Sequence, residues 1–117
     1  DEMLALGYSL NNSGEHERAL EAYDKAIELD PLSVPAYMGR GYTLNRLKRH
    51  EEALRAYNHA VELSPANAAA FVQRGFTLNA LQQFEEAAAS AREGLGLEPG
   101  NRAGLSVLST ALRHMRT

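Results

Sequence analysis

The sequence predicts an all-α fold built from helix hairpins that repeat along the chain. Proline recurs at a constant step of 34 residues, at positions 31, 65 and 99. Glycine keeps the same step at positions 7, 41 and 75, and alanine keeps it at positions 19, 53 and 87. A fixed period of this length is typical of solenoids made of stacked helical repeats. No segment shows the alternating pattern of a β-strand.

Each period contains two amphipathic helices. In the second period, Tyr37, Leu44 and Leu47 lie at helical spacing within residues 36 to 47. A second apolar stripe with the same spacing runs through residues 51 to 63. The link between the two helices is about three residues long, which permits only an antiparallel hairpin. The second helix should end before the proline, because the residue that precedes a proline disfavours the helical conformation.

Seven helices are therefore expected, two in each of three repeats and one after them. The predicted boundaries are repeat one at 1–33, repeat two at 34–67, repeat three at 68–101 and a capping helix at 102–117, all within one domain. The chain begins at Asp1 in the middle of the pattern and without an initiator methionine. We therefore expect it to be a piece of a longer protein.

The last helix has the pattern of a cap. Asn101 is a suitable N-cap residue for it. Arginines occupy one of its faces, and the opposite face carries Leu105, Leu108, Leu112 and Met115. A stack of hairpins leaves its last apolar face open, so we expect the leucine face to cover the third repeat and the polar face to meet solvent.

The composition excludes several functional classes. The formal net charge is −3 and charged residues make up 23% of the chain, so the overall charge predicts no attraction to nucleic acid or to an anionic membrane. No apolar run reaches the ~20 residues of a membrane span, and direct membrane insertion is not expected. Cysteine is absent, which excludes disulfides and thiolate chemistry. The compartment stays open, with the cytoplasm as the default.

No catalytic or cofactor signature is present. The sequence lacks a P-loop, an H-E-x-x-H motif, a G-x-S-x-G motif and a dinucleotide-binding glycine run. The four histidines have no partners at metal-ligand spacing. His16, His50 and Phe84 share one position of the repeat, which favours a packing role at the hairpin bend. We therefore expect no enzymatic activity, no cofactor and no metal site.

The helix-turn-helix period resembles the tetratricopeptide repeat family. In the second repeat the resemblance is carried by Tyr37, Gly41, Leu44, Ala53, Tyr57, Ala60 and Pro65. Equivalent residues follow through all three repeats, except that Ala91 and Gly94 replace the tyrosine and alanine of the third. The resemblance implies a right-handed superhelical solenoid whose first helices line a concave groove. In the family, a partner peptide usually lies in that groove.

One stripe of side chains on the first helices is not required for packing, and the resemblance places it in the groove. The predicted groove residues are Leu4, Tyr8, Asn11, Asn12, Met38, Tyr42, Asn45, Arg46, Val72, Phe76 and Asn79. The asparagines would bind the backbone amides of an extended segment, and the apolar side chains would form pockets. The alternative is that these side chains pack between neighbouring helices, which the asparagines then bond together.

The predicted function is a protein-interaction module that binds a peptide segment or helix of a partner protein. Leu4, Met38 and Val72 occupy positions where a clamp for a C-terminal carboxylate would need polar or basic side chains, so we expect no clamp of the chaperone-tail type. Arg40, Arg46 and Arg74 could contact an acidic residue of the partner. Two alternatives stay open, a self-assembly module that forms homo-oligomers and a substrate-presenting repeat region of a larger enzyme.

Overall fold

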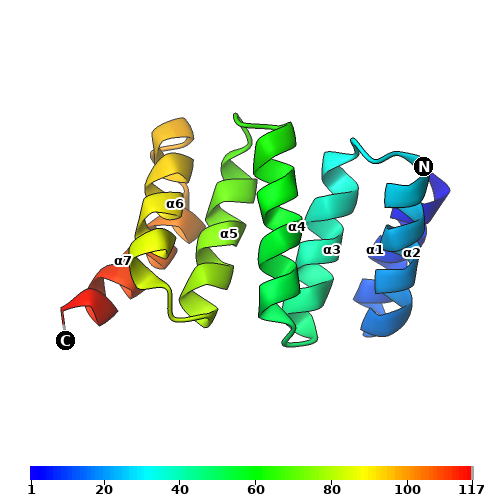
Figure 1. Ribbon diagram of the computed structural model, residues 1–117, viewed down its shortest axis with the longest axis horizontal. Coiled ribbons are helices and arrows are strands. Elements are labelled where there is room, and N and C mark those ends of the chain that lie inside the picture. The colour runs from blue at the N-terminus through cyan, green and yellow to red at the C-terminus, as the bar shows by residue number, and fades with distance from the viewer. Residues whose placement is uncertain (117) are drawn as a thin grey trace. The chain divides into compact units, whose positions relative to one another are not determined.

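The computed structural model describes residues 1–116, which form helices and no strand. In chain order, the helices are α1 (Glu2–Asn12), α2 (His16–Leu29), α3 (Val34–Arg46), α4 (His50–Leu63), α5 (Ala68–Ala80), α6 (Phe84–Leu97) and α7 (Arg102–Met115) (Figure 1). This confirms the predicted all-α helical repeat fold. The helices form two compact units: unit 1 covers Asp1–Leu63 and unit 2 begins at Ser64. The expectation of a single domain stays a prediction.

Three repeat-equivalent residues begin α3, α5 and α7. The Ser33 hydroxyl accepts from the amide of Ala36 at 3.3 Å. In the same way Asn67 accepts from the amide of Ala70 at 3.1 Å, and Asn101 accepts from the amide of Gly104 at 2.9 Å. These N-caps satisfy amides of the first turn that have no partner within the helix.

The same left-handed turn joins the two helices of each hairpin. Positive φ angles occur at Gly14 (79°), Lys48 (63°) and Gln82 (62°). One residue later, the backbone amide returns to the first helix: Glu15 to the Leu10 carbonyl at 2.8 Å, Arg49 to Leu44 at 2.8 Å and Gln83 to Leu78 at 2.9 Å. This is the Schellman arrangement, in which glycine is the favoured residue at the left-handed position. The second helices end at residues 29, 63 and 97, ahead of each proline as predicted.

In unit 1, the core is built around two buried tyrosines that face glycines. A β-carbon at Gly7 would lie 2.6 Å from the Tyr23 ring, and one at Gly39 would lie 2.4 Å from it. A β-carbon at Gly41 would lie 2.6 Å from the Tyr57 ring. Tyr23 of α2 can therefore pack against both α1 and α3, because both helices present a glycine to its ring.

Unit 2 has no tyrosine at the equivalent position and packs with smaller side chains. Ala91 forms a buried cluster there with Val72 and Val107. A β-carbon at Gly94 would lie 2.8 Å from a methyl group of Val72 and 3.2 Å from the carbonyl of Ala68. The small residues at positions 91 and 94 therefore allow α6 to approach α5 closely.

The packing face of α7 differs from the predicted one. Its buried residues are Gly104, Val107 and Ala111. Leu108 packs against the buried cluster of unit 2, but Leu105 is 51% exposed and Met115 is 43% exposed, so the prediction that the leucine face covers the third repeat holds only in part. Gly104 explains the difference, because it lies close to Leu95 and Val72 and allows this face of small residues to approach the unit more closely than leucines could.

None of the helices in residues 1–116 is both long enough and apolar enough to cross a membrane.

Candidate functional site

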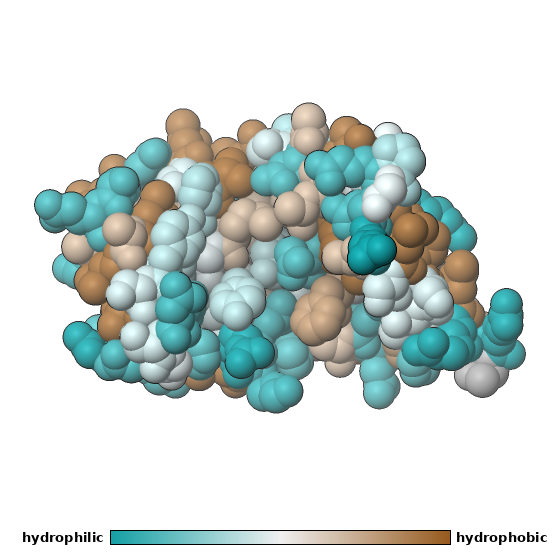
Figure 2. Space-filling view, turned by 180° about the vertical axis from the view of Figure 1, so that it is seen from behind, coloured by the Kyte–Doolittle hydropathy of each residue, from teal (hydrophilic) through white to brown (hydrophobic). Residues whose placement is uncertain are grey.

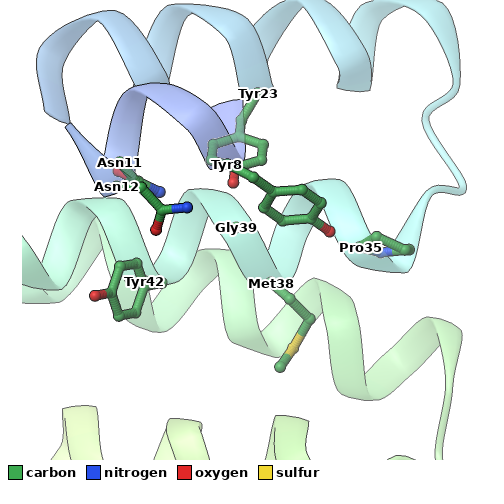
Figure 3. Close-up of a pocket in the computed structure, with 8 residues that line it drawn as sticks. All are labelled: Tyr8, Asn11, Asn12, Tyr23, Pro35, Met38, Gly39 and Tyr42. Carbon is green, nitrogen blue, oxygen red and sulfur yellow. The ribbon is translucent and has the colours of Figure 1, made fainter. Parts of the chain in front are cut away.

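A pocket of about 430 Å³ opens on the surface of unit 1, between α1 and α3 (Figure 3). It is lined by Tyr8, Asn11 and Asn12 of α1, Tyr23 of α2, and Pro35, Met38, Gly39 and Tyr42 of α3. None of these eight side chains carries a charge. Seven come from two helices whose first residues are separated by 32 positions in the chain, so the pocket depends on how the helices pack.

Gly39 keeps the pocket open. The Tyr23 ring lies directly over this glycine, and the Tyr8 ring meets the Tyr23 ring edge-on, with centroids 6.0 Å apart and planes at 67°. Such edge-to-face contacts are favourable because the positive edge of one ring meets the negative face of the other. A side chain at position 39 would occupy the pocket or displace Tyr23.

Two half-exposed aromatic rings form part of the lining. Tyr8 is 49% exposed and Tyr42 is 48% exposed. Figure 3 shows Tyr8 reaching from α1 toward Pro35, while Met38 and Tyr42 project from α3. An exposed cluster of rings and a methionine at one concave place is typical of a binding surface.

Burial governs the protonation of Tyr23 at the base of the pocket. It raises the pKa of the hydroxyl to about 12; the neighbouring Tyr8 adds to the increase and the Asn11 side chain opposes it. The geometry gives the buried hydroxyl no hydrogen bond with residues 1–116, so the Asn11 amide acts on it only as a nearby polar group. Tyr23 is therefore neutral at physiological pH and presents its ring to the pocket.

Asn11 and Asn45 form hydrogen bonds within unit 1. The Asn11 Nδ2 donates to the Thr43 hydroxyl at 2.9 Å, and its Oδ1 lies 3.0 Å from the Nδ1 of His16. The Asn45 Oδ1 lies 2.8 Å from the Nδ1 of His50. In both pairs the histidine nitrogen is the donor, since an amide oxygen can only accept. These bonds agree with the alternative in which the asparagines bond neighbouring helices.

Asn79 takes a different partner in unit 2. Its Nδ2 donates to the carbonyl of Val107 at 3.1 Å, which ties α5 to α7. Phe84 stands where the other repeats have histidine, and it stacks on His114 with centroids 4.5 Å apart and planes at 8°. The Oδ1 of Asn79 is consequently buried without a hydrogen-bond partner among the described residues.

The other predicted groove residues are divided between core and surface. Leu4 packs against the core cluster of unit 1, and Val72 is only 2% exposed within the core of unit 2. Phe76 is about as exposed as Tyr8 and Tyr42, at 52%. Arg46 is exposed at the last turn of α3. The position of Phe76 in a binding site stays a prediction.

Two of the three arginines predicted beside the groove make contacts between helices. Arg40 donates from Nε to Asp24 at 2.7 Å, which connects α3 to α2. Arg74 donates from Nε to the Ser90 hydroxyl at 3.1 Å and lies over the ring of Phe71. Burial lowers the pKa of Arg74, although the group stays charged.

Tyr23, Pro35 and Gly39 line the pocket but were not among the predicted groove residues. Tyr23 belongs to the packing pattern, so its sequence position suggested only a core role. Gly39 could have been singled out from the sequence, because it is not one of the glycines that recur in every repeat. The equivalent residues in the other repeats are Ala5 and Gln73. A glycine that only one repeat contains indicates a place where backbone comes close to another group.

Solved structures with the same fold cover almost the whole chain. The first tetratricopeptide repeat domain of Spaghetti (RPAP3), bound to the HSP90 peptide SRMEEVD, superposes with a TM-score of 0.95 and 27% identity over 98% of this chain and 91% of that one. The second such domain of human RPAP3, in complex with the HSP70 peptide SGPTIEEVD, gives a TM-score of 0.91 and 27% identity over 94% and 92% of the two chains.

A plant domain is similar to the same degree. The tetratricopeptide repeat domain of Arabidopsis OM64 has a TM-score of 0.92 and 25% identity over 96% of this chain and 93% of that one. No curated protein sequence matches this chain significantly. The family model for the tetratricopeptide repeat matches residues 4–70, which is more than half of the sequence. The chain therefore belongs to the tetratricopeptide repeat family.

Proposed function

We propose that this chain is a protein-interaction module that binds a peptide segment of a partner protein, and that the pocket of unit 1 receives part of that segment. The observation that carries the proposal is the uncharged pocket between α1 and α3, with its half-exposed Tyr8 and Tyr42. Related domains at 27% identity that were solved with bound peptides support it. The chain itself has no catalytic role in this proposal.

The chemistry of the pocket favours an uncharged anchor. Tyr8, Tyr42 and Met38 offer apolar surface for an aliphatic or aromatic side chain, which gains free energy when it leaves water. Asn12 is exposed at the rim and has an amide group suited to the backbone of an extended segment. The partner would thus be held by one buried apolar side chain and by backbone hydrogen bonds.

The peptides in the related structures have acidic C-terminal ends, which are a different type of ligand. A carboxylate is bound most strongly by arginine, lysine or backbone amides that donate directly to it. No lysine, arginine or histidine lines the pocket of unit 1. We therefore propose that this pocket selects an apolar side chain within a segment and contributes no carboxylate clamp.

A peptide array tests this function. Arrays of randomised peptides, together with the SRMEEVD peptide, are probed with the wild-type chain, with the Tyr42→Ala, Asn12→Ala double variant, and with Leu29→Ala. Leu29 is 74% exposed and lies outside the pocket, so it serves as the matched control for loss of an exposed apolar side chain. We expect the wild type and the control to capture peptides enriched in apolar residues, and the double variant to lose most of that signal.

Two results would contradict the proposal. One is that the double variant captures the same peptides with the same intensity as the wild type. The other is that the wild type binds only acidic C-terminal peptides and that both variants retain this binding. Circular dichroism of the double variant shows whether its helices are intact, so that a loss of capture can be assigned to the pocket.

A further inference from the structure

One face of α7 carries a row of apolar side chains that the rest of unit 2 covers only in part. We call this row, formed by Leu105, Leu108, Leu112 and Met115, the leucine seam. The helix packs on its own unit mainly through Gly104, Val107 and Ala111, and of the seam Leu108 packs against the buried cluster that contains Val107. Leu105 and Met115 remain about half exposed, and Leu108 and Leu112 are partly buried.

The spacing of the leucine seam is that of a helix that packs against another helix. Its four members stand at i, i+3, i+7 and i+10, which are the a and d positions of a heptad repeat. At 1.5 Å per residue, the seam extends about 15 Å, or roughly three turns. A depression of about 380 Å³ lies along it, lined by Leu105, Leu108, Ser109, Leu112, Arg113 and Arg116.

Positive charge borders the leucine seam. Arg113 and Arg116 line the depression, and neither forms an ion pair with any residue in 1–116. The last nineteen residues of the chain contain three arginines and no aspartate or glutamate. In Figure 2, hydrophobic and hydrophilic side chains lie side by side on the right, at the C-terminal end of the chain. A partner that covers this surface must therefore combine apolar and acidic side chains.

The seam is held in place by contacts of the adjacent face of α7. The His114 ring stacks on Phe84 of α6, and its Nδ1 is 2.9 Å from the carbonyl of Thr110 within α7. Asn79 of α5 donates to the carbonyl of Val107. A surface that is already ordered gives up little conformational entropy when a partner binds.

We propose that the leucine seam is a second docking surface, separate from the pocket of unit 1, and that it binds an acidic amphipathic helix of a partner protein. The apolar face of that helix packs between Leu105, Leu108 and Leu112. Its glutamates or aspartates lie beside Arg113 and Arg116. This is recognition of a helix by a helix, unlike the extended segment proposed for the pocket.

A second copy of the chain is the competing occupant. The first 33 residues contain eight acidic and two basic residues, a formal charge of −6, which would also complement the arginines of α7. The exposed large apolar residues of that region are Leu6 and Tyr8 on α1, Leu29 at the end of α2 and Leu32 in the loop after it, and their positions form no heptad row. The spacing of the seam therefore favours a helix from another protein.

The probe is a synthetic helical peptide of about three heptads with leucine at a and d and glutamate at e and g, used at concentrations where it is monomeric. Matched peptides carry lysine in place of glutamate, serine in place of leucine, or a central proline that prevents the helix. Fluorescence anisotropy measures their binding to the full chain. We expect only the acidic leucine peptide to bind, and to bind more weakly as salt is increased.

Charge reversal on the protein gives the sharper test. Arg113→Glu with Arg116→Glu should weaken binding of the acidic peptide by about tenfold and create binding of the lysine peptide. Leu105→Ser should weaken both complexes, and because Leu105 is exposed it should leave the helicity unchanged. Leu29→Ala, an exposed apolar residue outside both sites, serves as the control and should leave binding of the acidic peptide as it is, while Tyr42→Ala tests whether that peptide enters the pocket of unit 1.

Three outcomes would overturn the proposal. In the first, the wild type binds the lysine peptide, or the proline peptide, as tightly as it binds the acidic leucine peptide. In the second, Tyr42→Ala removes binding and the α7 variants do not, which would place the peptide in the pocket. In the third, light scattering shows that the chain self-associates and that Arg113→Glu with Arg116→Glu abolishes the association, which would make a second copy the occupant.

Discussion

The ring of Tyr23 lies so close to Gly39 that a β-carbon on this glycine would stand 2.4 Å from two ring atoms. This contact joins α2 to α3 and also leaves the space in which the pocket of unit 1 opens. The same glycine thus serves both the packing of the fold and the shape of the candidate site.

Gly39→Ala should lower the free energy of unfolding by about 1–3 kcal/mol, because the methyl group forces Tyr23 out of its packing position. Gly96→Ala is the matched control, since Gly96 lies in α6 with nothing within 4 Å of its β-carbon position. There the gain in helix propensity should raise stability by up to about 1 kcal/mol. Urea denaturation of the two variants should therefore shift in opposite directions, and equal shifts would contradict the proposed contact.

Substitutions at the left-handed positions of the three hairpin turns should change the stability of the chain in opposite directions. Lys48→Gly and Gln82→Gly should each stabilise the chain by about 0.5–1 kcal/mol, because glycine adopts the left-handed conformation without strain. Gly14→Ala should destabilise it by about 1 kcal/mol for the converse reason. Thermal melts followed by circular dichroism compare the three variants. A loss of stability in both glycine variants would show that strain at these turns is negligible.

Asn11 and Asn12 are neighbours in sequence with different predicted roles. Asn11→Ala should cost about 1–2 kcal/mol of stability, because Asn11 hydrogen-bonds to Thr43 and His16. Asn12→Ala should change stability by less than about 0.5 kcal/mol, because Asn12 is exposed, yet it should weaken peptide binding. Denaturation and peptide binding measured on both variants separate the structural role of Asn11 from the binding role of Asn12. If Asn12→Ala were as destabilising as Asn11→Ala, this distinction would be refuted.

The raised pKa of Tyr23 predicts that the chain loses stability at alkaline pH. Its pKa is about 12 in the folded chain and 10.0 ordinarily, so the unfolded chain releases this proton first as the pH rises. The stabilising contribution is complete below about pH 10 and is lost between about pH 10 and pH 12. Burial also raises the pKa of Tyr57, which acts in the same direction.

Tyr23→Phe isolates the contribution of that hydroxyl. At neutral pH the variant should be at least as stable as the wild type, because the buried hydroxyl has no hydrogen-bond partner among the described residues. Between about pH 9 and pH 11 it should lose about 1 kcal/mol less stability than the wild type. Denaturation series at several pH values measure the difference, and parallel curves for the two proteins would disprove the assignment.

The helices, their ends and their turns were predictable because the forces that set them are local. The N-cap at Asn101, the helix end before Pro65 and the hairpin turn near Lys48 each depend on residues within a few positions along the chain. The repeat period adds a second source of information, since equivalent positions must satisfy the same packing. These two properties allowed the family and the all-α fold to be identified from the residues.

The site was predicted only in part. Tyr8, Asn12, Met38 and Tyr42 line the pocket as a helical stripe would place them. Val72 occupies the same stripe but is buried, because unit 2 lacks a tyrosine at position 91 and Val72 fills part of the space. The spacing of residues along a helix shows which side chains share a face, but it does not show how near the neighbouring helix will come.

Contacts between residues far apart in the chain decided the shape of the pocket and the packing face of α7. Gly39 meets Tyr23 from 16 positions away, which opens the pocket of unit 1. Gly104 lets α7 approach Leu95 and Val72 through its small residues, which leaves Leu105 and Met115 of the leucine seam exposed. The periodic sequence established the helices and their order, whereas the choice of packing face followed from which side chains were small enough to let two backbones meet. The packing face therefore depends on steric fit in three dimensions, which cannot be predicted from the apolar pattern of one helix alone.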